Sequence, residues 1–317
     1  MKTIKYIAAA SAAIMILFSS CEKILEVKPV IELADEIALN STVGLDAALI
    51  GAYHKLQDGD LYGGRFWVSP DMIAGSVKIS GLQNTVFEEL QMLNKTMSGQ
   101  SNRIVQSTWE RSYQAVAIIN KLLAFLPDVD DAEMTEETRK RIEGEAKFLR
   151  GLIFFELSRL YSYDVSGAGP LATPVFTEPL TPFDTPPRAS IEEAYTQIIM
   201  DLEDAAELLV GINTNGRATD VAAMALMSRV KFYQEDWPGV ITAANYVIDQ
   251  FSGKPNGGLS DDILNCFQTG TPDQEVLFAI LSWLLKCSEM SVILESVRSR
   301  AASRRKDRKG TGKGIEN

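Results

Sequence analysis

The stretch from residue 145 to residue 161 constrains the fold of this chain more than any other part of the sequence. Apolar residues recur there at steps of three and four, which predicts a buried stripe made of Ala146, Leu149, Ile153, Leu157 and Leu160. A second apolar stripe lies beside the first and contains Phe148, Leu152 and Phe155. A helix that is apolar on two sides needs neighbours on both. We therefore expect this helix inside an array of helices rather than at its edge.

Helical periodicity also dominates the rest of the middle of the chain. The apolar spacing predicts helices over 43–57, 104–126 and 135–161, one starting at 190, one from 219 to about 235, and one from 236 to about 251. Ser190 and Glu193 have the spacing of a capping box, in which the hydroxyl and the carboxylate each accept a free amide of the first turn. Thr219 and Asp236 stand where caps of the last two helices are expected.

The last two of these helices resemble one tetratricopeptide unit. The resemblance rests on Met227-Ser228, on Phe232-Tyr233 and on Asp236-Trp237 at the turn, whereas Val240 replaces the usual alanine. One degenerate repeat is weak evidence alone, but three helix pairs follow one another along the chain. We therefore predict an all-α fold, a tetratricopeptide-like helical superhelix with long irregular loops inserted, over residues 43–280.

Two segments are predicted to interrupt the helical array. Residues 57–101 are rich in glycine and aromatic residues, and residues 164–187 contain six of the twelve prolines of the chain. Loops of this length are uncommon in compact domains and often carry function. A stiff spacer with no binding role is the interpretation we favour for the proline-rich segment.

The first twenty residues have the features of a lipoprotein signal peptide. Lys2 and Lys5 precede an apolar run over 7–18 that is too short to span a bilayer, and small residues then lead into Cys21. We expect cleavage before Cys21 and a diacylglycerol group on its thiol, which anchors a domain without a transmembrane helix. Residues 21–42 are then a lipidated N-terminal arm. The alternative is ordinary secretion, with Cys21 left as a free thiol.

The other end of the chain differs in charge from the body. The chain has a net charge of −11, whereas residues 286–317 hold nine basic and four acidic residues. This composition predicts a disordered basic tail over 281–317. The interpretation that we favour is an aberrant tail, with the natural reading frame lost soon after Ile280; the alternatives are a tail that binds nucleic acid or anionic lipid and a merely solvated terminus. No disulfide is predicted between Cys266 and Cys287.

Six motifs in the right order resemble the SusD/RagB family, the surface glycan-binding lipoproteins of Bacteroidetes-type bacteria. The segment 145–161 resembles the family stretch EAxFLRAxxYFxLxRxYG. The other matches include Leu49, Tyr53, Trp109, Tyr113, Asn120, Arg188, Ser190, Tyr195, Asp201, Gly216, Arg217, Arg229, Asp236 and Trp237. The resemblance runs from Cys21 to about Ile280, and the C-terminal portion of the family is missing. Most matching residues are expected to be structural: we expect Trp109, Tyr113 and Tyr195 in the core, and Arg150 and Arg217 paired with carboxylates or capping helix ends.

The resemblance implies a lipoprotein of the outer membrane that faces the cell exterior and is not an enzyme. Such a protein binds oligosaccharide or polysaccharide and closes it, as a hinged lid, into a TonB-dependent transporter of the SusC type. Two alternatives stay open. One is a helical-repeat lipoprotein that binds only proteins, such as an assembly factor, and the other is a truncated remnant that binds no glycan.

Candidate sugar contacts come from the aromatic-bearing segment over 57–101. Sugar binding without catalysis uses aromatic rings against the apolar faces of sugar rings, together with amide and hydroxyl groups that bond to the sugar hydroxyls. The candidates are Tyr62, Trp67, Asn84, Phe87 and Asn94. The competing interpretation, which we favour, is that Phe66 or Trp67 fills the helical core.

The residue types argue against catalysis and against metal or cofactor binding. His54 is the only histidine, so a histidine-rich metal site and a Ser-His-Asp triad both lack support. No pair of carboxylates stands in a recognisable catalytic arrangement. Gly63-Gly64 lacks the spacing and the Lys-Ser/Thr ending of a phosphate loop. The acidic body argues against a nucleic-acid partner.

Overall fold

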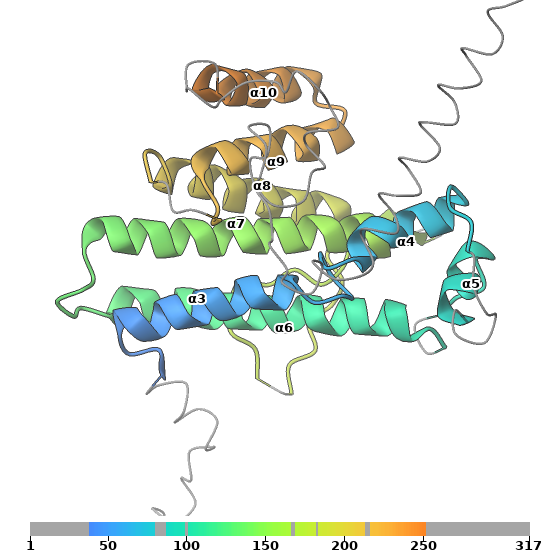
Figure 1. Cartoon of the computed structure of the whole chain (residues 1–317), viewed down its shortest axis with the longest axis horizontal. Coiled ribbons are helices and arrows are strands. Elements are labelled where there is room, and N and C mark those ends of the chain that lie inside the picture. Colours follow the sequence, from blue (N-terminus) through green and yellow to red (C-terminus); the bar gives the residue numbers. More distant parts are fainter. Residues whose placement is uncertain are drawn as a thin grey trace, which may run out of the picture.

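The computed structural model describes residues 38–79, 87–98, 101–165, 169–181, 183–212 and 216–251. These residues form an array of helices with one short hairpin (Figure 1), which confirms the predicted all-α class. The elements in chain order are α3 (Thr42–Leu56), α4 (Arg65–Ala74), α5 (Phe87–Leu93), α6 (Arg103–Phe125), the 3-10 helix η2 (Leu126–Asp128), α7 (Glu136–Tyr161), β1 (Tyr163–Val165), β2 (Gly169–Leu171), α8 (Ile191–Leu208), α9 (Asp220–Tyr233) and α10 (Trp237–Phe251).

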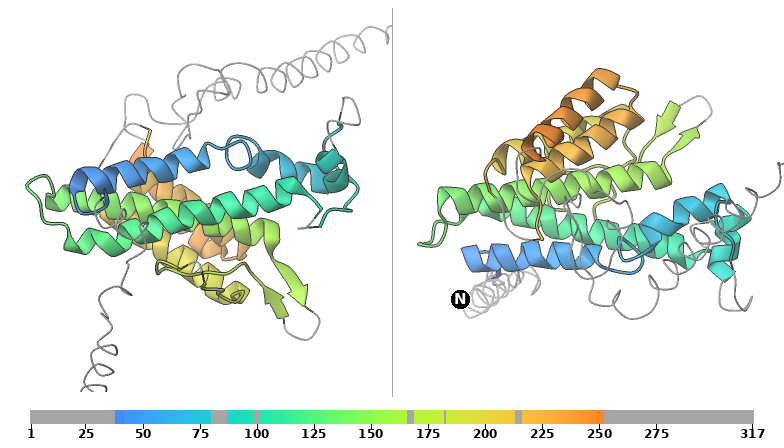
Figure 2. Two further views of the ribbon diagram at one scale, coloured as in Figure 1. Left: turned by 90° about the horizontal axis from the view of Figure 1, so that it is seen from below. Right: turned by 45° about the horizontal axis from the view of Figure 1, so that its top comes forward.

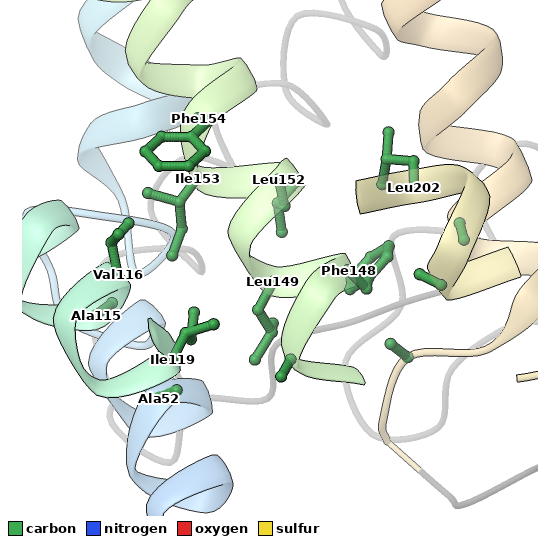
Figure 3. Close-up of a cluster of buried hydrophobic side chains, with 14 of the residues drawn as sticks. Ala52, Ala115, Val116, Ile119, Phe148, Leu149, Leu152, Ile153, Phe154 and Leu202 are labelled. Carbon is green, nitrogen blue, oxygen red and sulfur yellow. The ribbon is translucent and has the colours of Figure 1, made fainter. Parts of the chain in front are cut away.

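Helix α7 lies at the centre of the array. It packs against α3 and α6 on one side and against α8 and α9 on the other (Figure 1). Figure 3 shows Ile153 beside Val116 of α6, whereas Phe148 points to the side on which Leu202 of α8 lies. All four side chains are buried. Both predicted stripes of this helix are therefore covered by neighbouring helices.

Two glycines of α7 allow α8 to approach it closely. A Cβ atom on Gly144 would lie 2.7 Å from Cγ of Leu209, and one on Gly151 would lie 3.2 Å from Cγ of Leu202. Each leucine therefore packs directly against the backbone of α7. The close approach explains why a helix of this length tolerates two residues of low helical propensity.

Side-chain caps fix where the helices begin, as the sequence predicts at Ser190 and Thr219. Thr219 Oγ1 accepts the amide of Ala222 at 3.1 Å. At Ser190 both halves of the capping box form: its hydroxyl accepts the amide of Glu193 at 3.1 Å, and the Glu193 carboxylate accepts the amide of Ser190 at 2.8 Å. Local chemistry therefore sets the first residue of α8 before any tertiary contact is considered.

Replacing Ser190 with alanine is expected to lower the free energy of unfolding by about 1 kcal/mol, since the amide of Glu193 loses its acceptor. The hydrogen bond from the Ser190 amide lowers the pKa of the Glu193 carboxyl. The stability that Glu193 contributes is thus present above its unfolded pKa of about 4.3 and is lost as the pH falls through the lowered folded value.

Urea unfolding at neutral pH and in acid measures both halves of this capping box. Glu193→Gln should weaken the loss of stability in acid, because it removes the titrating group. Ser228→Ala, within α9 rather than at its start, is the matched control and should leave stability nearly unchanged. A Ser190→Ala protein as stable as the wild type would show that this cap contributes nothing.

The expectation that residues 57–101 are irregular is partly wrong. They contain α4 and α5, which pack on each other at one end of the array (Figure 1). Pro70 inside α4 and the glycines on either side of this helix conceal it in the sequence. Tertiary packing outweighs the proline, because Met72 of α4, Met92 of α5 and Ile104 of α6 form a small core of their own.

The proline-rich segment after the β1–β2 hairpin lies against α6. The hairpin itself is antiparallel and pairs Tyr163 with Leu171. Further along, the Tyr113 hydroxyl donates to the carbonyl oxygen of Pro174 at 2.7 Å, and the Asn120 amide donates to that of Phe176 at 3.0 Å. Side chains of α6 therefore satisfy a backbone that forms few ladder hydrogen bonds of its own. The segment is fixed to the array, while its binding role stays open.

The two arginines predicted to be structural both pair with carboxylates. Arg150 of α7 is buried and donates to both carboxylate oxygens of Asp201 of α8, at 2.9 and 2.7 Å. Arg217 lies 3.2 Å from Asp46 and 3.3 Å from Glu145. These pairs join segments that are far apart in the sequence.

Candidate functional site

The loop between α3 and α4 is folded tightly on itself. The amide of Tyr62 donates to the carbonyl oxygen of Leu56 at 3.1 Å, and the amide of Gly63 donates to the backbone carbonyl oxygen of Asp58 at 3.0 Å. Gly63 is needed for this turn, because a Cβ atom there would lie 2.5 Å from the carbonyl oxygen of Gln57. The loop therefore holds a defined shape and sets the direction in which α4 begins.

Three aromatic side chains meet where this loop joins α4. The ring of Tyr62 contacts Phe66 edge-on at 5.1 Å between centroids and contacts Trp67 in the same way at 5.8 Å. Phe66 is buried in the main core, whereas 58% of Trp67 is exposed. The prediction that one of the two fills the core is thus confirmed for Phe66. We call the exposed Trp67 ring, with Tyr62 against it, the Trp67 platform.

Tyr62 is held in place from the other side by α7. Its hydroxyl donates to Oε1 of Glu156 at 3.1 Å, and this buried carboxylate also pairs with Arg159 and Arg229. Burial, and after it the negative charge of Glu156, raises the pKa of Tyr62 well above its ordinary value. The hydroxyl therefore stays protonated and keeps donating. The Trp67 platform rests on the central helix and does not depend on a loose loop.

Charged side chains surround the same loop and the start of α4. Arg65 pairs with Glu89 of α5 at 2.8 Å, and Arg111 of α6 pairs with Asp58 at 2.7 Å. These side chains are partly exposed, so they keep hydrogen-bonding capacity toward the solvent side. An exposed aromatic ring can cover the apolar face of a neutral ligand with many hydroxyls, and charged side chains can bond to its hydroxyls.

The structure brings together only some of the residues predicted to contact sugar. Tyr62 and Trp67 touch each other, and Tyr62 contributes its ring edge while its hydroxyl is occupied by Glu156. Phe87 begins α5 with 60% of its side chain exposed, and Asn94 is exposed just after that helix. Asn84 lies outside the described residues. The contact role of all five residues stays a prediction.

Sequence reasoning missed the charged residues around the Trp67 platform. Asp58 and Arg65 belong to its loop and to α4, whereas their partners Arg111 and Glu89 belong to α6 and α5. The charged residues Asp58, Asp60 and Arg65 are visible in the sequence, but the sequence does not indicate their partners. Only the packing of α4 and α5 on α6 brings the four residues to one surface.

In the described part of the chain, histidine and acidic side chains do not gather in groups of three or more that could hold a metal ion. Among its helices, none combines the length and the apolar character needed to cross a membrane. Cys21, Cys266 and Cys287 lie outside this part.

Comparison with known proteins supplies a family for this array. Residues 23–232 match the model of a SusD-like family described as starch-binding and associating with the outer membrane. The chain belongs to this SusD-like family. A SusD-like protein of Formosa agariphila is 23% identical over 267 residues, which cover 78% of this chain and 47% of that protein. The chain thus spans about half the length of the curated relatives it matches.

Solved structures of SusD-like proteins share the fold. A SusD superfamily protein from Bacteroides thetaiotaomicron superposes with a TM-score of 0.63 at 24% identity, over 75% of this chain and 52% of that one. A laminarin-binding SusD-like protein superposes with a TM-score of 0.55 at 26% identity, over 70% of this chain and 45% of that one. The array of α3 to α10 is therefore a SusD-like fold, as the six sequence motifs indicate.

Proposed function

We propose that this SusD-like protein binds oligosaccharide or polysaccharide and passes it, as a lid, to a TonB-dependent transporter of the SusC type. Membership of a family described as starch-binding and the similarity to a laminarin-binding protein support the ligand class. The observation that carries the proposal for this chain is the Trp67 platform, where an exposed tryptophan is fixed against a partly buried tyrosine. The role proposed is binding without a chemical step.

The ligand binds in this proposal by stacking and by hydrogen bonding. A sugar ring lies on the exposed indole of Trp67, which is already held by Tyr62 and needs no ordering when the ligand arrives. In this proposal Asp58 of the preceding loop and Arg65, the first residue of α4, bond to hydroxyls of the sugar. Such a site takes neutral glycans, and the transporter then removes the ligand without any change to its bonds.

Trp67→Ala is expected to weaken binding of laminarin or soluble starch by roughly tenfold or more, since truncating a central aromatic side chain typically removes a large share of binding energy. Isothermal titration calorimetry measures the affinity, and thermal melting checks that the variant folds. Phe183→Ala is the matched control, because that ring is 92% exposed and lies in the proline-rich segment. Unchanged affinity in a folded Trp67→Ala protein would remove the platform from the site.

We further propose that Cys21 carries the lipid that anchors the protein to the outer membrane, facing the cell exterior. The family description, which places its members at the outer membrane, supports the location. Antibody or protease access on whole cells tests the orientation, and Cys21→Ala should release the protein from the membrane fraction. Protection from protease in intact cells, together with no binding on a glycan array, would favour a periplasmic protein that binds only proteins.

A further inference from the structure

A second pocket lies away from the Trp67 platform, between the β1–β2 hairpin and the ends of three helices. It has a volume of about 700 Å³, within the range of small-molecule sites. The hairpin projects from the array (Figure 2). Its residues Gly169 and Pro170 line this pocket, and the end of α7, the start of α8 and the end of α9 complete the wall. We call it the hairpin pocket. Its polar lining includes Ser158, Ser162, Glu192, Tyr195, Tyr233 and Gln234.

Two hydroxyls in the wall of the hairpin pocket lack a hydrogen-bond partner. Among the described residues, nothing bonds to the buried hydroxyl oxygen of Ser158 or to that of Ser162. Ser158 as a whole is only 4% exposed. Buried polar groups nearly always have a hydrogen-bond partner, because a buried hydroxyl without one has lost its hydrogen bonds to water and gained none in return, which costs stability. Both hydroxyls can donate and accept, but each oxygen is itself buried, so a ligand hydroxyl bonds to it only once the serine side chain rotates toward the pocket.

Aromatic rings in the same wall are held firmly. Tyr233 is about half exposed, and its ring contacts Phe155 edge-on at 5.4 Å between centroids. The guanidinium of Arg159 lies 5.1 Å from the centroid of the Tyr233 ring. Tyr195 meets the same Phe155 edge-on at 6.4 Å. Burial, and after it Tyr233, raises the pKa of Tyr195, so its hydroxyl remains a donor.

The charges near the hairpin pocket favour a neutral ligand. Glu192 contributes a carboxylate to the lining, which repels anions. Two guanidiniums lie close to this wall: that of Arg159 pairs with Glu156 and lies over the Tyr233 ring, and that of Arg188 donates to the carbonyl oxygens of Tyr161 and Ala172. What the wall offers is hydroxyls, one amide side chain and two tyrosine rings. This combination matches the alternating apolar faces and hydroxyl edges of a sugar.

We propose that the hairpin pocket binds a neutral sugar unit, as a second glycan site separate from the Trp67 platform. The proposal uses none of the residues of the platform. A glycan long enough to reach both surfaces would gain avidity, and a short oligosaccharide would occupy the two sites independently.

The test uses the full chain and short glucose oligosaccharides derived from starch and from laminarin. In a Trp67→Ala background, titration calorimetry should still detect one binding event, which Tyr233→Ala weakens by about tenfold or more. Ser158→Ala should weaken this second binding event. It should leave the melting temperature unchanged or raise it, because it removes a buried hydroxyl that has no hydrogen-bond partner. Phe183→Ala, an exposed aromatic that does not line the pocket, is the matched control.

The two sites fail in distinguishable ways. If Trp67→Ala abolishes binding completely, while Tyr233→Ala and Ser158→Ala leave it unchanged, the hairpin-pocket proposal is wrong and the platform proposal stands. If only Tyr233→Ala and Ser158→Ala weaken binding, the hairpin-pocket proposal stands and the platform proposal is wrong. A folded wild-type chain that binds neither oligosaccharide overturns both proposals.

Discussion

Replacing Arg150 with methionine is expected to lower the free energy of unfolding by about 3–5 kcal/mol. The guanidinium is buried and donates to both oxygens of Asp201 and to Oδ1 of Asn120 at 2.9 Å. Methionine keeps most of the volume but leaves the Asp201 carboxylate buried without its cation. Removing the cation also favours the protonated carboxyl, so the loss should shrink as the pH is lowered.

Urea unfolding measures this loss, with two controls. Lys140→Ala removes an exposed ion pair with Glu136 and should cost roughly 0.5 kcal/mol or less. Combining Arg150→Met with Asp201→Leu removes both charges and should restore part of the stability, because no unpaired charge remains in the core. An Arg150→Met protein as stable as the Lys140→Ala control would mean that water reaches Asp201.

Phe148→Ala is expected to cost about 3–5 kcal/mol, since it removes a large buried ring and leaves a cavity between α7 and α8. The side chain is 2% exposed and faces the side of Leu202 (Figure 3). Phe183→Ala makes the same chemical change at a surface position and should leave stability nearly unchanged. Comparable losses in the two variants, measured by denaturant unfolding, would contradict the assignment of Phe148 to the core.

The helical array could be predicted from the sequence because its signals are local. The two stripes of α7, the capping box at Ser190 and the cap at Thr219 depend on residues within a few positions of each other. In the structure α8 and α9 begin one residue after these two caps. Periodicity and capping chemistry need no knowledge of distant neighbours.

Helices α4 and α5 could not be predicted in the same way. Pro70 and the flanking glycines give α4 the local signature of a loop, and the packing of Met72 against Met92 and Ile104 reverses that preference. The adjacent aromatics Phe66 and Trp67 differ in burial for a similar reason. Nothing in the local sequence distinguishes them, and only tertiary packing places Phe66 in the main core and leaves Trp67 exposed.

The candidate sites were still harder to predict. The Trp67 platform was found in part, since an aromatic-bearing segment directs attention to Tyr62 and Trp67. Its charged surroundings depend on α5 and α6. The lining of the hairpin pocket comes from α7, the hairpin, α8 and α9, and Tyr195 among its residues was interpreted only as core. Sites assembled from separate segments leave no spacing pattern in the chain.

The central position of α7 has a consequence for how the protein unfolds. In an ordinary helical-repeat array each unit touches only its neighbours, so such arrays can unfold piece by piece. Here α7 packs against α3, α6, α8 and α9, so losing it uncovers the apolar layers on both sides at once. Backbone amides of those helices should therefore exchange with deuterium at a common, high free energy. Helix α10 packs chiefly against α9, and its amides should exchange first.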